Sequence, residues 1–207
     1  AASGFGKLLA EQLSAAGARL VLGDLNKDGL TAVAATLPGE VAVLPCDVAK
    51  EMQVEQLVAT ALQHFGRLDI AINNAGMSPL YDRPVDISEA LYDKVLVVNL
   101  KGPFRLSAAI GERMIADGGG GAIINISSGA AVRPRANVIT YSAAKAGLNA
   151  MTEAFADALG PTVRVNCICP GVIDTDMARI GFADLSEEAE FYPLKRIGTA
   201  TEVAKGI

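Results

Sequence analysis

The chain has 207 residues, of which 51% are hydrophobic and 20% are charged, a composition typical of a globular domain with ample material for a core. The net charge of −5 and the lack of a basic cluster argue against a nucleic-acid-binding surface. Three cysteines, an odd number, argue against a disulfide framework and are typical of a reducing compartment. We therefore expect a cytoplasmic protein without a membrane span, since no apolar run is long enough to cross a bilayer. His64 is the only histidine, so we predict no metal site and place His64 on a helix surface.

Five apolar runs predict buried strands, and in chain order they cover residues 18–25, 41–48, 68–76, 121–128 and 163–171. The runs are dense in Val, Ile and Leu rather than alternating with polar residues, as in a parallel sheet that is covered on both faces. Helical periodicity separates them, over residues 5–17, 29–37, 51–65, 88–116 and 141–159. This alternation predicts a doubly wound α/β fold with helices on both faces of a parallel sheet. The glycine-rich residues 117–122 precede a strand rather than a helix, so we predict a loop there instead of a phosphate cradle.

In such sheets ligands bind at the carboxyl ends of the strands, so the residues that close each strand are the candidates for chemistry. Gly4 and Gly6 lead directly into the first helix, where a backbone without side chains can approach a pyrophosphate. Asp24 closes the next strand, near the spacing at which a carboxylate accepts hydrogen bonds from the adenosine ribose. No arginine stands beside Asp24 to receive a 2′-phosphate, which favours NAD over NADP. A solvated turn residue is the alternative for Asp24 alone.

Further candidates follow the later strands. Asp47 lies where it could meet an adenine amino group, and the sequence NNAG (residues 73–76) closes the next run. Ser128 ends another strand, ahead of a helix that carries Tyr141 and Lys145. These two residues are four positions apart and therefore lie on one helical face. By itself that spacing also fits a surface helix with a solvated ammonium.

The ordered set of these motifs resembles the short-chain dehydrogenase/reductase (SDR) family. The matching segments are SGFG (3–6), GDL (23–25), CDV (46–48), NNAG (73–76), VVNLKGPF (97–104), IINISS (123–128), YSAAK (141–145) and NCICPGVIDT (166–175). The resemblance runs through nearly the whole chain, in the order and approximate spacing of the family. It implies one NAD(P)-binding Rossmann domain over residues 1–207 and an oxidoreductase that moves hydride between a nicotinamide cofactor and a secondary alcohol or ketone.

The resemblance also implies a catalytic tetrad of Asn99, Ser128, Tyr141 and Lys145. Tyr141 would exchange a proton with the substrate oxygen, and the Lys145 ammonium would lower the phenol pKa from about 10 toward neutrality. Lys145 would also hold the nicotinamide ribose, Ser128 would orient the substrate oxygen, and Asn99 would interrupt its helix and position a water. Cofactor contacts are implied for Ser3, Gly4, Phe5, Gly6, Asp24, Leu25, Asp47, Val48, Asn74, Ala75, Gly76, Tyr141, Lys145, Pro170, Gly171, Ile173 and Thr175.

The sequence departs from the family pattern at its two ends. The phosphate motif of the family is preceded by a first strand, and here the first strand, a threonine and the first glycine are lacking. At the other end, Thr199 and Glu202 are spaced as a capping box, and we expect the final helix and strand to be incomplete. Residues 176–198 occupy the position of the substrate loop. In relatives the helices at 88–116 and 141–159 form a subunit interface, which implies a homodimer or homotetramer.

Two alternatives remain beside an NAD-dependent alcohol dehydrogenase or ketone reductase. One is a 3-oxoacyl-[acyl-carrier-protein] reductase that uses NADPH, which is disfavoured because Asp24 favours NAD. The other is a dinucleotide-binding regulator without turnover, which is disfavoured because all four residues of the catalytic tetrad are present.

Overall fold

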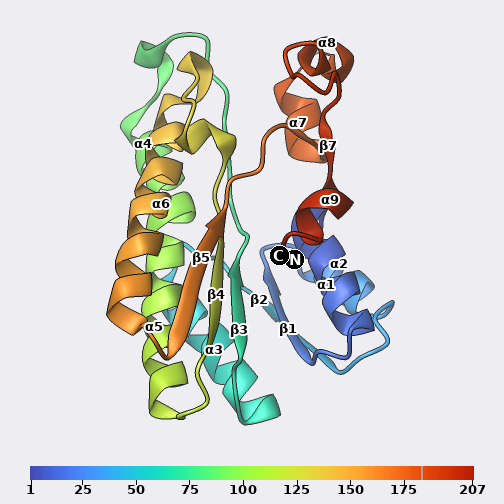
Figure 1. Cartoon of the computed structure of the whole chain (residues 1–207), viewed down its shortest axis with the longest axis vertical. Helices are drawn as coiled ribbons and strands as arrows, with labels where there is room; N and C mark the ends of the chain where they lie inside the picture. The colour runs from blue at the N-terminus through green and yellow to red at the C-terminus, as the bar shows by residue number, and fades with distance from the viewer. Residues whose placement is uncertain (183) are drawn as a thin grey trace.

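Parallel strands flanked by helices on both faces make up the computed structural model, which describes residues 1–182 and 184–207 (Figure 1). This confirms the predicted doubly wound α/β class. The strands are β1 (Leu20–Asp24), β2 (Val41–Pro45), β3 (Ile70–Asn73), β4 (Gly121–Ile126), β5 (Val163–Ile168), β6 (Ile173–Asp174) and β7 (Gly198–Thr199). The α-helices are α1 (Gly4–Ala15), α2 (Lys27–Ala34), α3 (Glu51–Phe65), α4 (Glu89–Leu96), α5 (Gly102–Ala116), α6 (Ile139–Leu159), α7 (Asp176–Gly181), α8 (Leu185–Ala189) and α9 (Ala200–Ala204).

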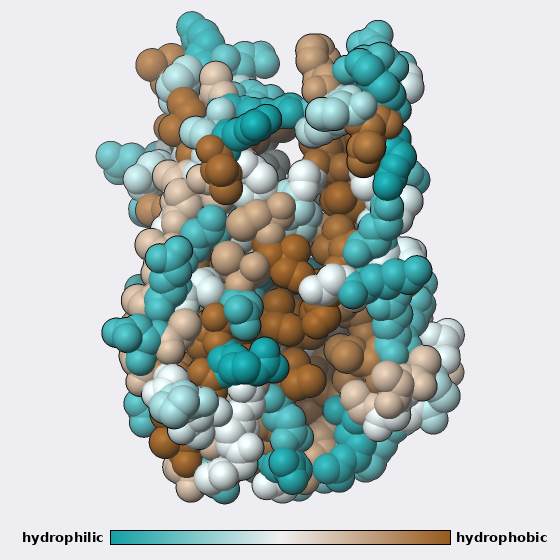
Figure 2. Space-filling view, viewed as in Figure 1, coloured by the Kyte–Doolittle hydropathy of each residue, from teal (hydrophilic) through white to brown (hydrophobic). Residues whose placement is uncertain are grey.

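The strands pair in three parallel groups, namely β1 with β2, β3–β4–β5 in that order, and β6 with β7. In the three-stranded group Ile123 lies between Ala71 and Val165. Among the described residues no strand pairing joins β1 to β3, and the two groups stand apart in Figure 1. Apolar side chains gather in the middle of the same face in Figure 2, over this region. Helix α3 contacts β1 and β2 on one side and α5 on the other, and so connects the two groups.

Most predicted elements are confirmed, and α3 matches its predicted range. Its buried residues Val54, Val58 and Ala61 recur at helical spacing, and Gly66 ends the helix in the left-handed conformation with φ of 73°. His64 is exposed near the end of this helix, as predicted. The residues of 117–120 form a turn, in agreement with the predicted loop, before β4 begins at Gly121.

The five predicted strands are wrong at their carboxyl ends, because the observed strands stop one to three residues earlier. Their last predicted residues leave the ladder and form the loops at the strand ends, which is where the candidate site residues lie. The short strands β6 and β7 were not predicted, because two-residue strands leave no periodic signal.

The predicted helix over 88–116 is divided, and the interruption falls at Asn99, where the resemblance implied it. A five-residue π-helix, η2 (Val97–Lys101), separates α4 from α5. Such π-turns occur where a helix accommodates an extra residue, often at functional sites. Asn99 stands at the centre of this interruption.

Two apolar clusters form the interior. The larger one lies between β3–β4–β5 and the helices α3, α5 and α6, and its buried members are Val58, Ala71, Ile110, Met114, Ile123, Leu159, Val163 and Val165. The smaller one joins α1 and α2 to β1, and its buried members are Ala10, Leu22, Leu30 and Val33.

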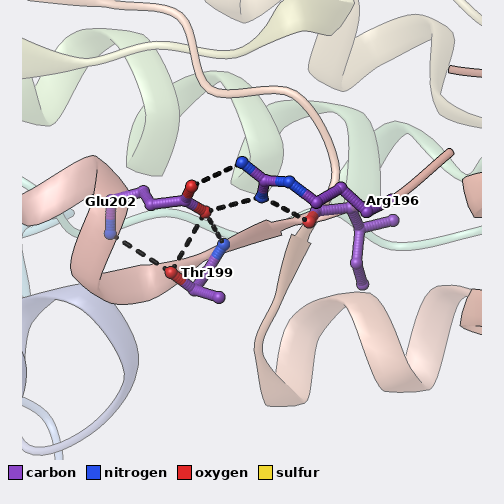
Figure 3. A network of polar contacts seen from close by, with 4 residues as sticks. Arg196, Thr199 and Glu202 are labelled. Atoms are coloured by element: carbon purple, nitrogen blue, oxygen red, sulfur yellow. Dashed lines mark hydrogen bonds and ion pairs between the residues drawn. The ribbon is translucent and has the colours of Figure 1, made fainter. Parts of the chain in front are cut away.

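The predicted capping box at the end of the chain is confirmed (Figure 3). The Glu202 amide donates to the Thr199 hydroxyl at 3.3 Å, and the Thr199 amide donates to the Glu202 carboxylate at 2.8 Å. Arg196 adds a two-pronged ion pair at 2.7 and 3.0 Å, and this arginine together with the Thr199 amide lowers the Glu202 pKa to about 2. Within the described part of the chain, no helix has both the length and the apolar character needed to cross a bilayer.

Candidate active site

The pair Tyr141 and Lys145 lies in the first two turns of α6, beside the end of β4. The Lys145 Nζ lies 5.7 Å from the centroid of the Tyr141 ring, so the ammonium and the phenol share one helical face. Lys145 is only 3% exposed, and its Nζ donates to the carbonyl of Ile126 at 2.7 Å. This hydrogen bond fixes the lysine against the last residue of the strand.

Two serines follow that strand and have different partners. The Ser128 side chain lies near enough to the Tyr141 phenol to act on its pKa, and its hydroxyl accepts the Ala130 amide at 3.1 Å. The Ser127 hydroxyl is buried and donates to the carbonyl of Lys145 at 3.2 Å, so it ties the strand end to α6. The structure therefore brings Ser128, Tyr141 and Lys145 together at the carboxyl edge of the sheet.

The electrostatics of Tyr141 differ from the expectation. Burial raises the pKa of the phenol, and the nearby Ser128 only partly offsets this. The predicted lowering of this pKa by Lys145 is not seen in this structure, where burial of the phenol outweighs the effect of Ser128. Burial lowers the pKa of Lys145 to about 8, against an opposing effect of Cys169. With a pKa of about 8 the amine stays mostly protonated at neutral pH, and its Nζ–H is directed at the Ile126 carbonyl.

Asn99 is fully buried in the π-helix, with its side chain directed at the loop that follows β3. Its Nδ2 donates to the carbonyls of Val95 and Met77, both at 2.9 Å, and its Oδ1 accepts the Met77 amide at 3.2 Å. A Cβ on Gly76 would lie 3.0 Å from Asn99 Oδ1 and 3.7 Å from Lys145 Nζ. The asparagine thus fixes the NNAG loop beside the lysine, and glycine at 76 permits this close approach.

The predicted phosphate site lies at the start of α1. Gly4 has φ of 54°, a conformation that favours glycine, and a Cβ on Gly6 would lie 2.9 Å from the Asn74 side chain. Ser3, at the N-cap, gives no side-chain hydrogen bond to the helix. The first N–H groups of α1 are therefore left without a side-chain cap, as an anion site at a helix N-terminus requires.

Asp24 closes β1 beside this helix start. Its Oδ2 accepts the Ala1 ammonium at 2.6 Å and the Ala2 amide at 2.8 Å, and its Oδ1 accepts the Asn26 amide at 3.0 Å. Burial raises the pKa of Asp24, but these hydrogen bonds outweigh it and lower the pKa overall. The carboxylate is therefore ionised at neutral pH and points toward the segment that enters α1.

The remaining predicted contacts lie in the loops after the strands. Asp47 Oδ1 accepts the Ala49 amide at 3.0 Å. Val48 lies against Gly102, where a Cβ on the glycine would come within 2.9 Å of the Val48 carbonyl oxygen. Thr175 caps α7, accepting the Ala178 amide at 3.5 Å, and its hydroxyl donates to Ile173 in β6. The other predicted contacts are placed as follows: Phe5 in the first turn of α1, Leu25 exposed after β1, Asn74 and Ala75 after β3, and Pro170 and Gly171 between β5 and β6.

Sequence reasoning missed two residues that shape the site. The Tyr81 hydroxyl accepts the Thr140 amide at 3.1 Å, in the first turn of the helix that carries Tyr141. Arg135, in the loop before that helix, pairs with Glu188 in α8. The partners are 59 and 53 residues apart, so no local pattern could have revealed either contact.

Comparison with known proteins places this geometry in a family. A family model described as enoyl-(acyl carrier protein) reductase matches residues 1–207. An NAD-dependent glycerol dehydrogenase from Listeria innocua is 36% identical, over 99% of this chain and 81% of the relative. Dehydrogenase/reductase SDR family member 4 of Bos taurus is also 36% identical, over 97% of this chain and 74% of the relative.

Solved structures of short-chain dehydrogenases/reductases are similar to this chain in fold. Levodione reductase has a TM-score of 0.93 at 33% identity, covering 99% of this chain and 84% of that structure. A 3-ketoacyl-(acyl-carrier-protein) reductase from Brucella melitensis, complexed with NADH, has a TM-score of 0.91 at 28% identity, covering 99% and 85%. The fold and the site define a nucleotide-binding α/β oxidoreductase. The chain belongs to the short-chain dehydrogenase/reductase family, whose members act on the CH–OH group of donors with nicotinamide cofactors.

Proposed function

We propose that this protein is an NAD-preferring dehydrogenase/reductase of secondary alcohols and ketones, with Tyr141 as its acid/base. The observation that carries the proposal is the contact of the Tyr141 phenol with Ser128, with the buried Lys145 5.7 Å from the ring. These three groups lie together at the carboxyl edge of a parallel sheet, where such folds bind their ligands.

The residues at the start of α1 fit a dinucleotide. The left-handed Gly4, the crowded Gly6 and the uncapped N–H groups of the helix would hold its pyrophosphate, and Asp24 would accept the hydroxyls of the adenosine ribose. When bound, the nicotinamide ring supplies or accepts the hydride. Lys145 would hold the nicotinamide ribose, and Ile173 and Thr175 would lie against the carboxamide.

Side chains of the protein itself would carry out the proton transfer. Because burial raises the pKa of Tyr141, the phenol is protonated at neutral pH and can donate its proton to the oxygen of a carbonyl substrate during reduction. Ser128 would hold that oxygen in place through its hydroxyl. In the reverse direction Tyr141 would accept the proton of an alcohol. Lys145, with a pKa of about 8, can change its protonation near the working pH and balance the charge on the phenolate.

The first test is Tyr141→Phe, which removes the hydroxyl and keeps the ring. We expect turnover to fall roughly a hundredfold to ten-thousandfold, the usual contribution of a positioned acid/base. NADH binding, measured by fluorescence titration, should change little. Tyr92→Phe, at a half-exposed tyrosine in α4, is the matched control and should keep full activity. Normal turnover in the Tyr141 variant would refute the assignment.

The cofactor preference is tested at Asp24. Asp24→Ala should weaken NADH binding and reduce the preference over NADPH about tenfold or more, because the variant loses two charge-assisted hydrogen bonds to ribose and a repulsion toward a 2′-phosphate. Asp28→Ala, at an exposed carboxylate in α2, is the control. An unchanged NADH/NADPH ratio would refute the ribose assignment.

The 3-oxoacyl carrier-protein reductase and the non-catalytic regulator are the outcomes that would replace this proposal. A granaticin polyketide synthase putative ketoacyl reductase from Streptomyces violaceoruber is 34% identical to the chain, which is compatible with the first of them. Turnover of carrier-bound 3-oxoacyl groups with NADPH, and not of simple ketones with NADH, would favour that reductase. Cofactor binding without turnover of any carbonyl in a broad panel would favour the regulator.

We also propose a homodimer or homotetramer that associates through α4, α5 and α6. The support is the apolar surface of these helices: Phe104 is 51% and Ile115 40% exposed, and Phe104 packs on Phe155 of α6 at 5.7 Å between ring centroids. Light scattering coupled to size-exclusion chromatography tests this. Phe104→Glu should shift the protein to a smaller species, and a monomeric wild type would contradict the proposal.

A further inference from the structure

Arg135 connects the loop before the catalytic helix to the segment at the substrate-loop position. Its Nη2 donates to Glu188 Oε1 at 2.5 Å and to the Tyr192 hydroxyl at 3.3 Å. The Tyr192 hydroxyl in turn donates to the same Glu188 oxygen at 3.1 Å. The guanidinium carbon also lies 5.6 Å from the centroid of the Phe182 ring. One arginine thus contacts three side chains of the segment 176–198.

The carboxylate in this cluster is the buried partner. Glu188 is 8% exposed, whereas the Arg135 side chain is 44% exposed. A carboxylate this buried is costly unless it is paired and hydrogen-bonded. Arg135 is its only charged partner within the described part of the chain, so the position of α8 depends on this contact. Conversely, Glu188 holds the guanidinium and raises the pKa of Arg135.

The other polar side-chain contacts of the segment are local. Arg179 binds Asp174, Lys195 binds Glu190 and Arg196 binds Glu202, each within six residues along the chain. Among the hydrogen bonds of residues 176–182 and 184–198, only those of Arg135 reach a distant side chain, across 53 and 57 residues. The remainder of the segment is held by local contacts and by the pairing of Gly198 with β6, so it can keep its own structure while the Arg135 contacts open.

Tyr192 also forms part of a cavity of about 290 Å³, with a largely apolar lining. Its other lining residues are Gly171, Val172, Ile173, Pro193, Leu194, Arg196, Ile197 and Gly198. Gly171 lies against Gly129, the residue after Ser128, and the Gly129 amide donates to the Pro170 carbonyl at 2.7 Å. One lining residue, Tyr192, therefore belongs to the Arg135 cluster, and another, Gly171, adjoins the loop that carries Ser128.

We propose that Arg135 is a positioning residue that latches the segment 176–198 over the substrate side of the site. This rests on the proposed function, because it assigns the segment to the substrate and not to the nucleotide. Release of the latch frees α8 and Tyr192, removes one wall of the apolar cavity, and leaves the start of α1 and Asp24 unaltered. A carbonyl or alcohol substrate with an apolar substituent then binds more weakly, and the dinucleotide does not.

The experiment compares Arg135→Gln with Arg133→Gln. Arg133 is an exposed arginine of the same loop, and no side-chain hydrogen bond or ion pair from it is found among the described residues. For Arg135→Gln we expect the substrate KM to rise roughly tenfold, the factor for one lost charged hydrogen bond. The dissociation constant of NADH should change less than about twofold. Trypsin should also cut faster within the segment, at Arg179, Lys195 or Arg196. Arg133→Gln should match the wild type in all three measurements.

A charge exchange separates the latch from a general loss of structure. The double variant Arg135→Glu/Glu188→Arg should recover a large part of the KM and of the trypsin resistance that Arg135→Glu alone loses. If Arg135→Gln does not fold, Arg135→Lys replaces it, since it keeps the charge and loses the planar fork. Trypsin resistance and KM equal to those of Arg133→Gln, or no recovery on exchange, would overturn the latch. The proteolysis readout needs no turnover, so the latch can be judged even if the Tyr141→Phe test refutes the proposed function.

Discussion

Lys145 is the residue whose environment departs most from that of a typical lysine. It is 3% exposed, and burial lowers its pKa from the usual 10.5 to about 8. Below about pH 8 this lysine is charged in both the folded and the unfolded chain. Because the folded chain binds the proton less tightly, the charged lysine lowers the free energy of unfolding in this pH range. This loss is recovered as the pH rises from about 8 toward 10.5, where only the unfolded chain still binds the proton.

We therefore expect the stability of the wild type to rise with pH in that window relative to Lys145→Met, by roughly 2 kcal/mol at pH 10. Urea unfolding at a series of pH values measures the difference between the two proteins at each pH. Using this difference removes the contributions of other groups, such as the Cys46 and Cys167 thiols, whose pKa values burial raises. Lys101→Met, at an exposed lysine, is the control. Parallel curves for the wild type and Lys145→Met would contradict the prediction.

At the scale of elements, the sequence predicted an element best where its buried apolar residues recur at one regular spacing. Helix α3 could be predicted in full because its apolar spacing is helical throughout and a left-handed Gly66 ends it. The π-helix at 97–101 was not predicted from periodicity, and only the resemblance pointed to an interruption at Asn99. The residues of the site could be placed because each follows a strand, but the pKa of Tyr141 could not, since it depends on burial by distant segments.

The start of α6 shows how a distant loop completes an element. Val138, at the N-cap, offers no side-chain acceptor, and the Tyr81 hydroxyl accepts the Thr140 amide instead. Loss of a helix cap costs about 1 kcal/mol. Tyr81→Phe should therefore lower the free energy of unfolding by about that amount, and it should also lower kcat because Tyr141 lies in the same turn.

Denaturant unfolding and steady-state kinetics check this prediction. Tyr92→Phe is again the matched control, since it removes a hydroxyl for which no partner is found among the described residues. Equal stability and equal kcat in the two tyrosine variants would mean that Tyr81 does not cap α6.

At the scale of the whole molecule, the two strand groups have interiors of different size. The cluster around β4 has eight buried members, and the cluster around β1 and α2 has four. β4 is paired along both edges, whereas β1 and β2, among the described residues, pair only with each other. Regions with smaller buried cores and fewer paired edges open at a lower free energy than the rest of a protein. The β1–β2 group and its helices should therefore open before the β3–β4–β5 group.

Leu30 and Ile123 allow a matched test of this order, because both are fully buried side chains of similar size, one in each cluster. Replacement of either by alanine costs roughly 2–5 kcal/mol. In Ile123→Ala we expect hydrogen exchange to accelerate in all strands, because the larger cluster holds the last structure to unfold. In Leu30→Ala we expect faster exchange in α1, α2, β1 and β2, with the amides of β4 unchanged. Mass spectrometry of peptides from each strand measures both effects. If Leu30→Ala accelerated exchange in β4 as much as in β1, the two clusters would form one cooperative unit, and α3, which contacts both groups, would be the element that couples them.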